Sequence, residues 1–368
     1  MRVKLKDITK FSKGTQINGK NLIDDGAYSY LNGGINPSGK WNEFNVAENT
    51  VTISEGGNSS GYVNYMSKAF WCGAHCYYLY DGPKNSKYLY YALKSQQERL
   101  FRIRSGACMP NIKKSDLGNF IIEYEEDETR QEEVVKVLEK CELLIEDYNK
   151  KLALLDEAVR ARFVEMFGDP VDNPMNWKKK KLKDIVTEDC TISYGIVQTG
   201  EDQKEGIPVF RPVDIVNHTP KVEELKKTTE FISDRYKKTL LKGHELLITV
   251  RANIADTFIA DKEFMGCNVG RGIVPIRTQE DIMRLEFLKC LIDNKHLNDI
   301  LKSKAKGITL IQLNMEDLRN VELIIPPIDL QIDYLKYSRL IDKSRSRIQK
   351  SLEASQELFD SLMQEYFS

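Results

Sequence analysis

The clearest pattern in the chain is a run of apolar residues whose spacing alternates between four and three, between Gln131 and Phe167. A 3.5-residue repeat keeps one stripe of an α-helix facing a partner, which is typical of a coiled coil. The stripe consists of Val134, Leu138, Cys141, Ile145, Tyr148, Leu152, Leu155 and Val159. At about 1.5 Å per residue this helix would be roughly 55 Å long. It needs a second helix to bury its apolar stripe.

The same pattern returns, less regularly, between Gln331 and Tyr366. Its apolar members are Ile341, Ile348, Leu352 and Phe359, and positions 338, 345 and 355 are polar. Polar residues in such a stripe fix register or partner choice, so we expect the two helices to pair within one chain. The first helix is acidic at its start and the second is basic at its start, which favours a parallel pair. A two-fold duplicated chain favours an antiparallel pair, and the charge pattern does not decide the direction.

An internal duplication organises the rest of the chain. Residues 4–8 and 181–185 both read Lys-Leu-Lys-Asp-Ile, and the apolar run 50–54 has a counterpart at 245–249. The regions before the helices contain short β-branched runs separated by Gly, Asn and Pro turns, with local helices predicted at 87–102 and 281–302. The predicted fold class is α+β, with two similar mixed α/β domains separated by two long coiled-coil helices in pseudo-two-fold symmetry.

The predicted domain boundaries follow the helices and the glycine and prolines at the join between the halves. Gly168 ends the first helix, and Pro170 and Pro174 cannot continue it. We expect a first globular domain at 1–124, a helix and linker at 125–170, a second globular domain at 171–326 and a second helix at 327–368.

Composition and charge narrow the class of protein. Of the 368 residues 41% are hydrophobic and 30% charged, which is typical of a globular chain. The sequence contains no apolar run of eighteen or more and no signal-peptide core, so we expect a cytoplasmic protein that does not bind a membrane. Seven cysteines without framework spacing indicate reduced thiols. Residues 1–122 carry 16 basic and 9 acidic groups, whereas residues 123–170 carry 7 and 15; the basic first domain is compatible with nucleic acid.

Motifs for catalysis, cofactors and metals are weak. Residues 34–41 nearly match a phosphate-binding loop, but Trp41 replaces the Ser or Thr that would hold magnesium, and a turn is the better interpretation. At most half of a zinc site is present, formed by Cys72, His75 and Cys76, with Cys108 as a distant fourth ligand. Because these cysteines lie in an aromatic strand, we expect them to be buried thiols. The sequence shows no glycine-rich methyl-donor loop, adenine-methylation motif or Ser-His-Asp pattern. We therefore predict no catalytic residue, no bound cofactor and no metal.

Loops rich in Lys, Arg, Asn, Gln, Ser and Tyr recur beside glycines in both halves. Such side chains supply the donors that phosphates and base edges accept. A solvated surface explains any one of these loops, but their recurrence in two duplicated halves favours DNA binding. The candidate DNA-binding residues are Lys13, Lys20, Asn36, Lys40, Asn58, Ser59, Arg104, Lys113, Arg211, Arg251, Asn253, Arg271, Lys304, Lys306 and Gln312.

The order of these features resembles the specificity subunit of type I restriction–modification enzymes. Residues 32–39, Asn-Gly-Gly-Ile-Asn-Pro-Ser-Gly, resemble the opening of one class of its target-recognition domains. Phe-Gly-Asp-Pro at 167–170, with Asn-Pro leading to Trp177, resembles its central join. Pro326-Pro327-Ile328 followed by Gln331 resembles the start of its C-terminal helix. At the first helix Glu125-Glu126-Asp127 replaces the prolines, although Gln131 keeps its place.

The resemblance implies a non-catalytic subunit that reads a bipartite target in double-stranded DNA. Antiparallel helices would hold the two recognition domains apart and dock two methyltransferase subunits, with restriction (motor-nuclease) subunits joining for cleavage. S-adenosylmethionine, ATP and Mg would be bound by those partners in a prokaryotic cytoplasm. Two alternatives are a coiled-coil protein–protein adaptor with no DNA binding and a self-contained hydrolase or methyltransferase. Replacing Arg251 or Arg271 with Ala should relax the second half-site and spare the first.

Overall fold

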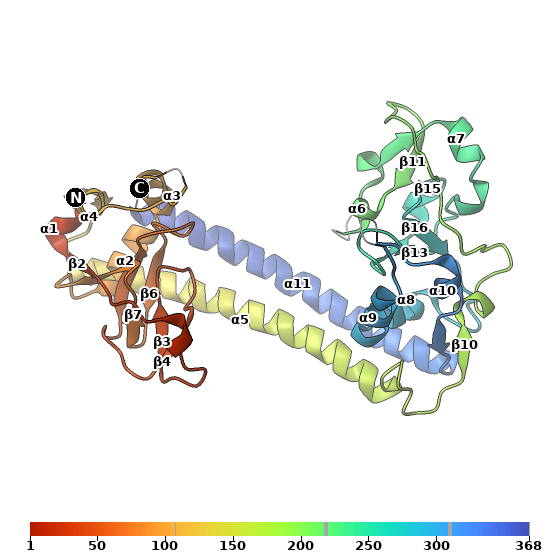
Figure 1. The fold of residues 1–368 in the computed structure, drawn as a ribbon, viewed down its shortest axis with the longest axis horizontal. Helices are drawn as coiled ribbons and strands as arrows, with labels where there is room; N and C mark the ends of the chain where they lie inside the picture. The colour runs from red at the N-terminus through yellow and green to blue at the C-terminus, as the bar shows by residue number, and fades with distance from the viewer. Residues whose placement is uncertain (107, 217–219, 308–310, 368) are drawn as a thin grey trace. The chain divides into compact units, whose positions relative to one another are not determined.

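The computed structural model describes residues 1–106, 108–216, 220–307 and 311–367. The chain forms two compact units: unit 1 comprises residues 1–152 and 347–368, and unit 2 comprises residues 153–346 (Figure 1). Each unit contains one mixed α/β globule and a part of each long helix. The fold class is therefore α+β with two similar domains and two long helices, as predicted.

Unit 1 is built on an antiparallel sheet with strand order β2-β8-β5-β6. A second sheet has the order β4-β3-β7, in which β3 pairs with β4 antiparallel and with β7 parallel. Helix α2 packs on the first sheet through β5 and β6. The elements are β1 (Arg2–Lys4), α1 (Leu5–Ile8), β2 (Lys10–Lys13), η1 (Gly19–Asn21), β3 (Tyr28–Leu31), β4 (Gly39–Trp41), β5 (Thr50–Ser54), β6 (Val63–Met66), β7 (Phe70–Cys72), β8 (Cys76–Tyr80), α2 (Ser86–Lys94), α3 (Gln97–Arg102), α4 (Lys114–Gly118) and β9 (Ile121–Glu123).

Unit 2 repeats this plan. Its central sheet has the order β14-β13-β16, and its second sheet has the order β12-β11-β15. As in unit 1, the middle strand of the second sheet, β11, pairs antiparallel with one neighbour, β12, and parallel with the other, β15. Helix α8 packs on β13 and β14 as α2 does on β5 and β6. The elements are β10 (Lys179–Lys181), η2 (Leu182–Asp184), β11 (Ile207–Phe210), α6 (Pro212–Ile215), η3 (Val222–Glu224), β12 (Lys226–Thr228), α7 (Glu230–Asp234), η4 (Lys237–Thr239), β13 (Glu245–Thr249), β14 (Thr257–Ala260), η5 (Lys262–Phe264), β15 (Asn268–Val269), β16 (Ile273–Ile276), α8 (Leu285–Asp293), α9 (Lys295–Ser303), α10 (Met315–Arg319) and β17 (Glu322–Ile324).

The duplication predicted from the sequence is confirmed in the topology. The two matched apolar runs are the central strands β5 and β13, with the predicted bounds. In each unit the first strand pairs with the strand that leads into the long helix, β1 with β9 and β10 with β17. Strand β2 is the exception, because unit 2 has at that place an isolated bridge between Val186 and Thr278.

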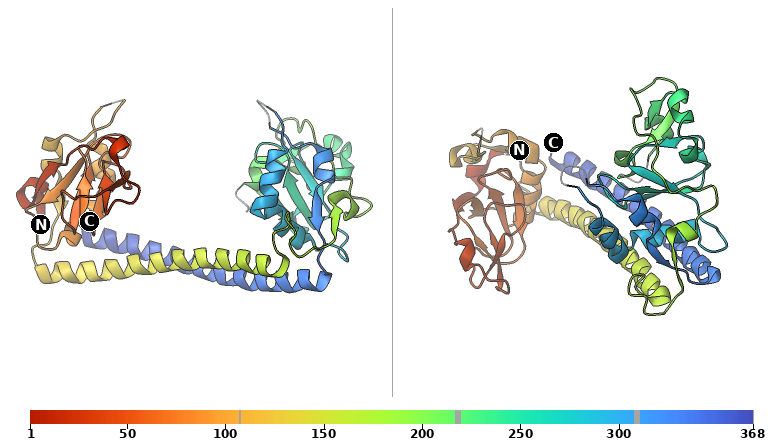
Figure 2. Two further views of the ribbon diagram at one scale, coloured as in Figure 1. Left: turned by 60° about the horizontal axis from the view of Figure 1, so that its bottom comes forward. Right: turned by 45° about the vertical axis from the view of Figure 1, so that its right-hand side comes forward.

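The long helices are α5 (Glu128–Phe167) and α11 (Ile328–Phe367), both continuous ribbons of 40 residues (Figures 1 and 2). Helix α5 begins three residues before the predicted Gln131 because the Asp127 carboxylate accepts the N–H groups of Thr129 and Arg130. The prolines at 326 and 327 set the start of α11.

The two helices run in opposite directions. In unit 1, Val134 and Leu138 near the start of α5 share a core with Phe367 at the end of α11. In unit 2, Phe167 at the end of α5 stacks edge-on against Tyr334 near the start of α11, with ring centroids 5.6 Å apart. The antiparallel arrangement implied by the family resemblance is therefore present.

The charges did not indicate this direction because many of them pair with the globule of their own unit. In α5, Glu142 lies 3.4 Å from the ammonium of Lys87 on α2 and accepts a 2.6 Å hydrogen bond from the hydroxyl of Tyr91. In α11, Arg339 pairs with Glu286 of α8 at 2.9 Å. Between the helices themselves, within unit 2, Arg345 pairs with Asp156.

Burial along the helices follows the predicted stripe. Val134, Leu138 and Cys141 are buried, and the stripe residues from Ile145 to Val159 are half-buried between exposed neighbours. The predicted members on α11, which are Ile341, Ile348, Leu352 and Phe359, are also half-buried. The three polar members of the second stripe, at 338, 345 and 355, have the same intermediate burial.

Each predicted local helix is in fact two helices. Residues 87–102 contain α2 and α3, separated at Ser95 and Gln96, and residues 281–302 contain α8 and all of α9 except Ser303. The second break occurs because the Asn294 side chain accepts the N–H groups of His296 and Leu297 and so caps a new helix. In the described part of the chain, no helix is both long and apolar enough to cross a membrane.

Candidate nucleic-acid interface

In both units a hairpin stem extends the central sheet just beyond the end of its middle strand. Ser105 and Asn111 exchange two backbone hydrogen bonds of 2.8 Å in unit 1, and Lys306 and Gln312 exchange two of 3.0 Å in unit 2. The stems are joined to the sheets by bridges from Asn111 to Gly56 and from Gln312 to Arg251. The segments inside the hairpins, residue 107 and residues 308–310, lie outside the described residues.

A glycine with positive φ starts each hairpin. Gly106 has φ +100° and Gly307 has φ +132°, values that side-chain-bearing residues rarely adopt. The pair of glycines seen in the sequence therefore has positive φ at the same place in both halves, directly after the first residue of each stem.

In unit 2 the loop after β13 has a strained backbone. Ala252 and Ala255 both have positive φ, 60° and 63°, which is unfavourable for a residue with a Cβ. The Thr249 side chain stabilises the loop, because its hydroxyl binds the carbonyl of Asn253 and accepts the N–H of Asp256. This loop presents Arg251, which is half-buried, and Asn253, which is exposed.

Arg251 is held in place by Gln312. The Nε–H and one Nη2–H of Arg251 are donated to Oε1 of Gln312, with Nε–Oε1 at 2.8 Å. Burial and the neighbouring Arg271 guanidinium lower the pKa of Arg251. In the described residues neither arginine has a carboxylate within 4 Å, so their charges are uncompensated.

The predicted residues of unit 1 differ in how free they are to bind a ligand. Lys20, Asn36, Lys40, Asn58 and Lys113 are exposed. Lys13 is also exposed, but its ammonium pairs with Glu55 at 2.7 Å. The Ser59 hydroxyl donates to the carbonyl of Gly33 at 2.5 Å. The Arg104 guanidinium donates to the carbonyls of Phe101 and Asn58 at 2.7 and 3.2 Å.

In unit 2 Arg211 is already paired within the protein, whereas other predicted cations are exposed. Arg211 is paired bidentately with Asp214, through Nε–Oδ2 at 3.1 Å and Nη2–Oδ1 at 2.8 Å. Arg271, Lys304 and Lys306 are exposed. The structure brings Arg251, Arg271, Gln312 and Lys306 to one end of the central sheet.

Sequence reasoning missed the counterparts of these residues in unit 1. Ser105, Gly56 and Asn111 occupy the positions of Lys306, Arg251 and Gln312, although as small or neutral residues they gave no signal for DNA binding. The internal duplication is the signal that would have found them, once the strand register was known.

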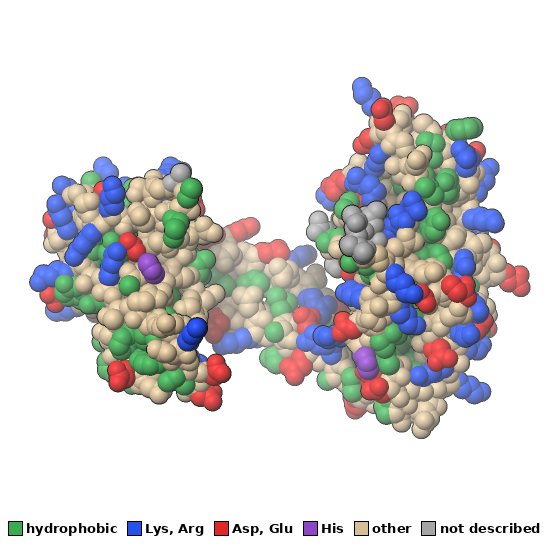
Figure 3. Space-filling model, in the orientation of Figure 1, with side chains coloured by type: hydrophobic (Ala, Val, Ile, Leu, Met, Phe, Trp, Pro, Cys, Tyr) green, Lys and Arg blue, Asp and Glu red, His purple; other side chains and the backbone are tan. Residues whose placement is uncertain are grey.

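The surface carries charges of both signs. In Figure 3 the Lys and Arg side chains and the Asp and Glu side chains are interspersed on the visible face of each unit. A patch of one sign would attract DNA without regard to sequence. Sequence-specific DNA binding is therefore better indicated by the unpaired hydrogen-bond donors at the ends of the central sheets than by net charge.

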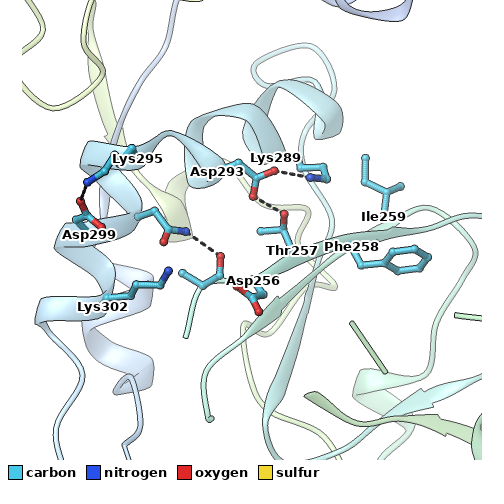
Figure 4. Close-up of a pocket in the computed structure, with 11 residues that line it drawn as sticks. Asp256, Thr257, Phe258, Ile259, Lys289, Asp293, Lys295, Asp299 and Lys302 are labelled. Carbon is cyan, nitrogen blue, oxygen red and sulfur yellow. Dashed lines mark hydrogen bonds and ion pairs between the residues drawn. The ribbon is translucent and has the colours of Figure 1, made fainter. Parts of the chain in front are cut away.

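A pocket of about 790 Å³ in unit 2, lined by β14, α8 and α9, does not offer a phosphate site (Figure 4). Lys295 pairs with Asp299 at 2.7 Å, and Lys289 pairs with Asp293. The Thr257 hydroxyl also donates to Asp293. These pairs neutralise most of the lining charge.

The metal and nucleotide motifs have structural roles. In residues 34–41, β4 begins at Gly39, and the N–H of Ser38 donates to the carbonyl of Tyr30 as in a turn. Cys72 and Cys76 are buried, while His75 is exposed and faces Glu55. In the described ranges, the one group of metal-binding side chains whose ligand atoms converge is Asp169, Asp172 and His296.

That group serves the end of α5. Oδ1 of Asp169 accepts the N–H groups of Val171 and Asp172 at 2.8 and 3.1 Å and lies 3.1 Å from Nδ1 of His296. These bonds fix the turn after Gly168, so the cluster is explained by the chain reversal itself.

Comparison with known proteins agrees with the duplicated plan. Residues 1–156 and 174–354 match the family model described as the type I restriction modification DNA specificity domain. The chain belongs to this family. The two matched segments cover most of the chain, and each ends within a long helix, in α5 and α11.

Curated relatives carry the same family name. The chain is 37% identical over 197 residues to a protein of Mycoplasma pneumoniae named as a type I specificity subunit, covering 52% of this chain and 51% of that protein. It is 23% identical over 222 residues to the type I restriction enzyme EcoBI specificity subunit of Escherichia coli, covering 60% and 47%. The chain thus spans about half the length of the curated relatives it matches.

The crystal structure of a type I restriction–modification system S subunit from M. genitalium has a similar fold. Its TM-score is 0.67 at 20% identity, with 100% of this chain and 96% of that chain covered. A second structure, from a study of complex assembly and conformational transition in the type I system, has a TM-score of 0.56 at 16% identity, covering 99% and 96%. Both likenesses concern the fold.

Proposed function

We propose that this chain is the DNA-reading specificity subunit of a type I restriction–modification complex and carries no catalytic site of its own. The observation that carries the proposal is that one chain of the DNA specificity family contains the same structural feature twice, a hairpin stem at the end of a central sheet. In each unit a hairpin stem extends the central sheet and brings polar side chains to its end. Two such stems in one chain would allow each unit to bind one half-site of a split target in double-stranded DNA.

The proposed partners are two methyltransferase subunits docked on the helices, with motor-nuclease subunits added for cleavage. Several apolar side chains outside the pairing stripe support docking, because they remain exposed on α5 and α11. They are Val137, Leu143, Leu144 and Leu358 in unit 1 and Leu154, Val164 and Leu340 in unit 2. S-adenosylmethionine, ATP and Mg would be bound by those partners, which would flip and methylate the target base.

The helices also suggest how the two half-sites are spaced. A 40-residue α-helix is about 60 Å long, or roughly seventeen base pairs at 3.4 Å per pair. We propose that helix length sets the gap between half-sites and that the globules set the bases.

DNA binding by the assembled complex tests this function. The chain is purified with the methyltransferase encoded beside it, and its binding is measured on duplexes carrying the split methylation motif of the host and on duplexes with either half scrambled. The proposal predicts binding that needs both halves and weakens steeply with salt. The adaptor alternative predicts a stable protein complex that protects no duplex at any salt concentration.

A further inference from the structure

Four side chains lie in one row across the end of the central sheet of unit 2. In β13 and β16, Thr249 faces Ile273, and the N–H of Val250 donates to the carbonyl of Gly272 at 2.8 Å. Arg271 lies in the turn before β16, where the N–H of Ile273 donates to the carbonyl of Gly270 at 3.1 Å, and its guanidinium is close enough to lower the pKa of Arg251. On the other side Arg251 is bridged to Gln312, which is bridged to Lys306. We call Lys306, Gln312, Arg251 and Arg271 the unit 2 row.

This row is electrostatically unfavourable without a ligand. Like charges held close together repel each other, and the row carries three cations. In the described part of the chain none of the three has a carboxylate within 4 Å, although Arg211 is paired with Asp214. A row of unpaired cations at a sheet end suits an anion or a surface rich in acceptors.

The contact between Gln312 and Arg251 determines which donors remain free. Oε1 of Gln312 occupies the side edge of the guanidinium, formed by Nε–H and one Nη2–H. The opposite edge of the guanidinium, which has one N–H of Nη1 and one N–H of Nη2, can still donate to a ligand. The bond to Gln312 fixes the direction in which this edge points. Two parallel donors of this kind match O6 and N7 of guanine in the major groove.

The equivalent row in unit 1 has the same backbone and no cation. Ser54 faces Cys76, and the N–H of Glu55 donates to the carbonyl of His75 at 2.8 Å. Ala74 lies in the turn before β8, as Arg271 lies in the turn before β16. Gly56 is bridged to Asn111, and Asn111 to Ser105. The unit 1 row is therefore Ser105, Asn111, Gly56 and Ala74.

The position that corresponds to Arg251 is open in unit 1. A Cβ added to Gly56 would meet nothing within 4 Å, and its φ is not in the left-handed region. A side chain can therefore be placed there without disturbing the sheet.

From these two rows we infer that the end of each central sheet is a position at which a DNA base is read. In unit 2 Arg251 occupies this position and recognises a guanine. In unit 1 Gly56 occupies it, and no side chain there recognises guanine. Gln312 acts as a positioning residue that aims the guanidinium. This inference rests on the proposed function and adds to it the base class and the residue that reads it.

The test is the methylated motif produced by the full chain expressed with its methyltransferase in a host without adenine methylation. The wild-type motif should contain a guanine in one half. Arg251→Ala and Arg251→Lys should both relax that position by about tenfold or more, because lysine keeps the charge but loses the paired donors. Gln312→Ala should relax the same position less.

The gain-of-function arm uses the open position in unit 1. Gly56→Arg should add a preference for guanine in the other half of the motif and leave the first preference intact. A matched control is Lys4→Ala, an exposed cation on β1 outside both rows and outside the candidate DNA-binding set, which should change no base preference.

The outcomes separate this inference from the proposed function. If the wild-type chain yields no split motif, the proposed function itself fails. If the wild type does yield one, the inference is overturned when Arg251→Ala leaves the permitted bases unchanged, or when it lowers methylation equally at all sites, as loss of a phosphate contact would. A Gly56→Arg chain that leaves both halves unchanged also contradicts it.

Discussion

Gln131 and Gln331 occupy the same position in the two long helices, and both bury their side-chain amides against the segment that leads into the helix. Nε2 of Gln131 donates to the carbonyl of Glu125 at 2.6 Å, and Nε2 of Gln331 donates to the carbonyl of Pro326 at 2.9 Å. Gln331 also accepts the N–H of Arg284 at 2.9 Å, whereas Oε1 of Gln131 has no hydrogen-bond partner among the described residues.

Replacing Gln331 with Ala should therefore destabilise the protein more than replacing Gln131. The first change leaves the buried N–H of Arg284 and two carbonyls without partners, at a cost of about 1–3 kcal/mol. Denaturant unfolding of the purified chain measures the difference. Gln356→Ala, at an exposed site on α11, is the control. Equal midpoints for Gln331→Ala and the control would show that the buried amide does not stabilise the start of the helix.

Tyr88 provides a pH-dependent prediction. Burial in the core of unit 1, against Tyr124 and Phe367, raises the pKa of Tyr88 to about 12. The neutral phenol therefore contributes stability that is fully present below pH 10, where the unfolded chain begins to ionise, and is lost as pH rises to about 12.

Absorbance titration of the ionised phenol, compared between the wild type and Tyr88→Phe, isolates this residue. The difference should have a midpoint near pH 12 in the folded protein. A difference curve with its midpoint at the ordinary tyrosine value, near 10, would be incompatible with the burial of Tyr88.

The long helices and the duplication were predictable because they depend on repeated patterns. The stripe from Val134 to Val159 needs only helical geometry, and the central strands were located as matched apolar runs of the duplication. The breaks within the shorter predicted helices were harder to locate. The cap at Asn294 competes with an apolar periodicity that continues through it.

The site was less predictable than the fold. Arg251 and Arg271 were chosen by chemistry, but their closeness depends on the pairing of β13 with β16, whose register no sequence pattern specifies. The direction of the helices was also hidden, because Glu142 and Arg339 pair with their own globules through Lys87 and Glu286. Residue type thus gave the donors, and tertiary structure decided which donors remain free.

Cations that are already paired should contribute less to DNA binding than unpaired ones. Lys113 is exposed and, within the described residues, has no carboxylate within 4 Å, whereas Lys13 pairs with Glu55 at 2.7 Å. Lys113→Ala should lower the slope of log affinity against log salt by about 0.9 if it contacts a phosphate. Lys13→Ala should lower it less. The measurement is binding of the assembled complex to its duplex over a salt series, and a larger effect at Lys13 would oppose this assignment.

Helix length should change the gap in the target and leave its bases unchanged. Seven residues inserted into the middle of both α5 and α11 preserve the stripe and lengthen each helix by about 10 Å, or roughly three base pairs. The motif of the lengthened chain should have the same two halves with a wider gap. An unchanged gap, or altered halves, would disprove the spacer role.

The central claim is that this chain supplies the sequence specificity of a DNA-modifying complex. It is tested most directly by single-molecule sequencing of genomic DNA from a host that expresses the neighbouring methyltransferase with or without this chain. The account predicts a split motif methylated at adenine only when the chain is present. The same methylation pattern in its absence, or no modified motif from an assembled complex, would contradict it.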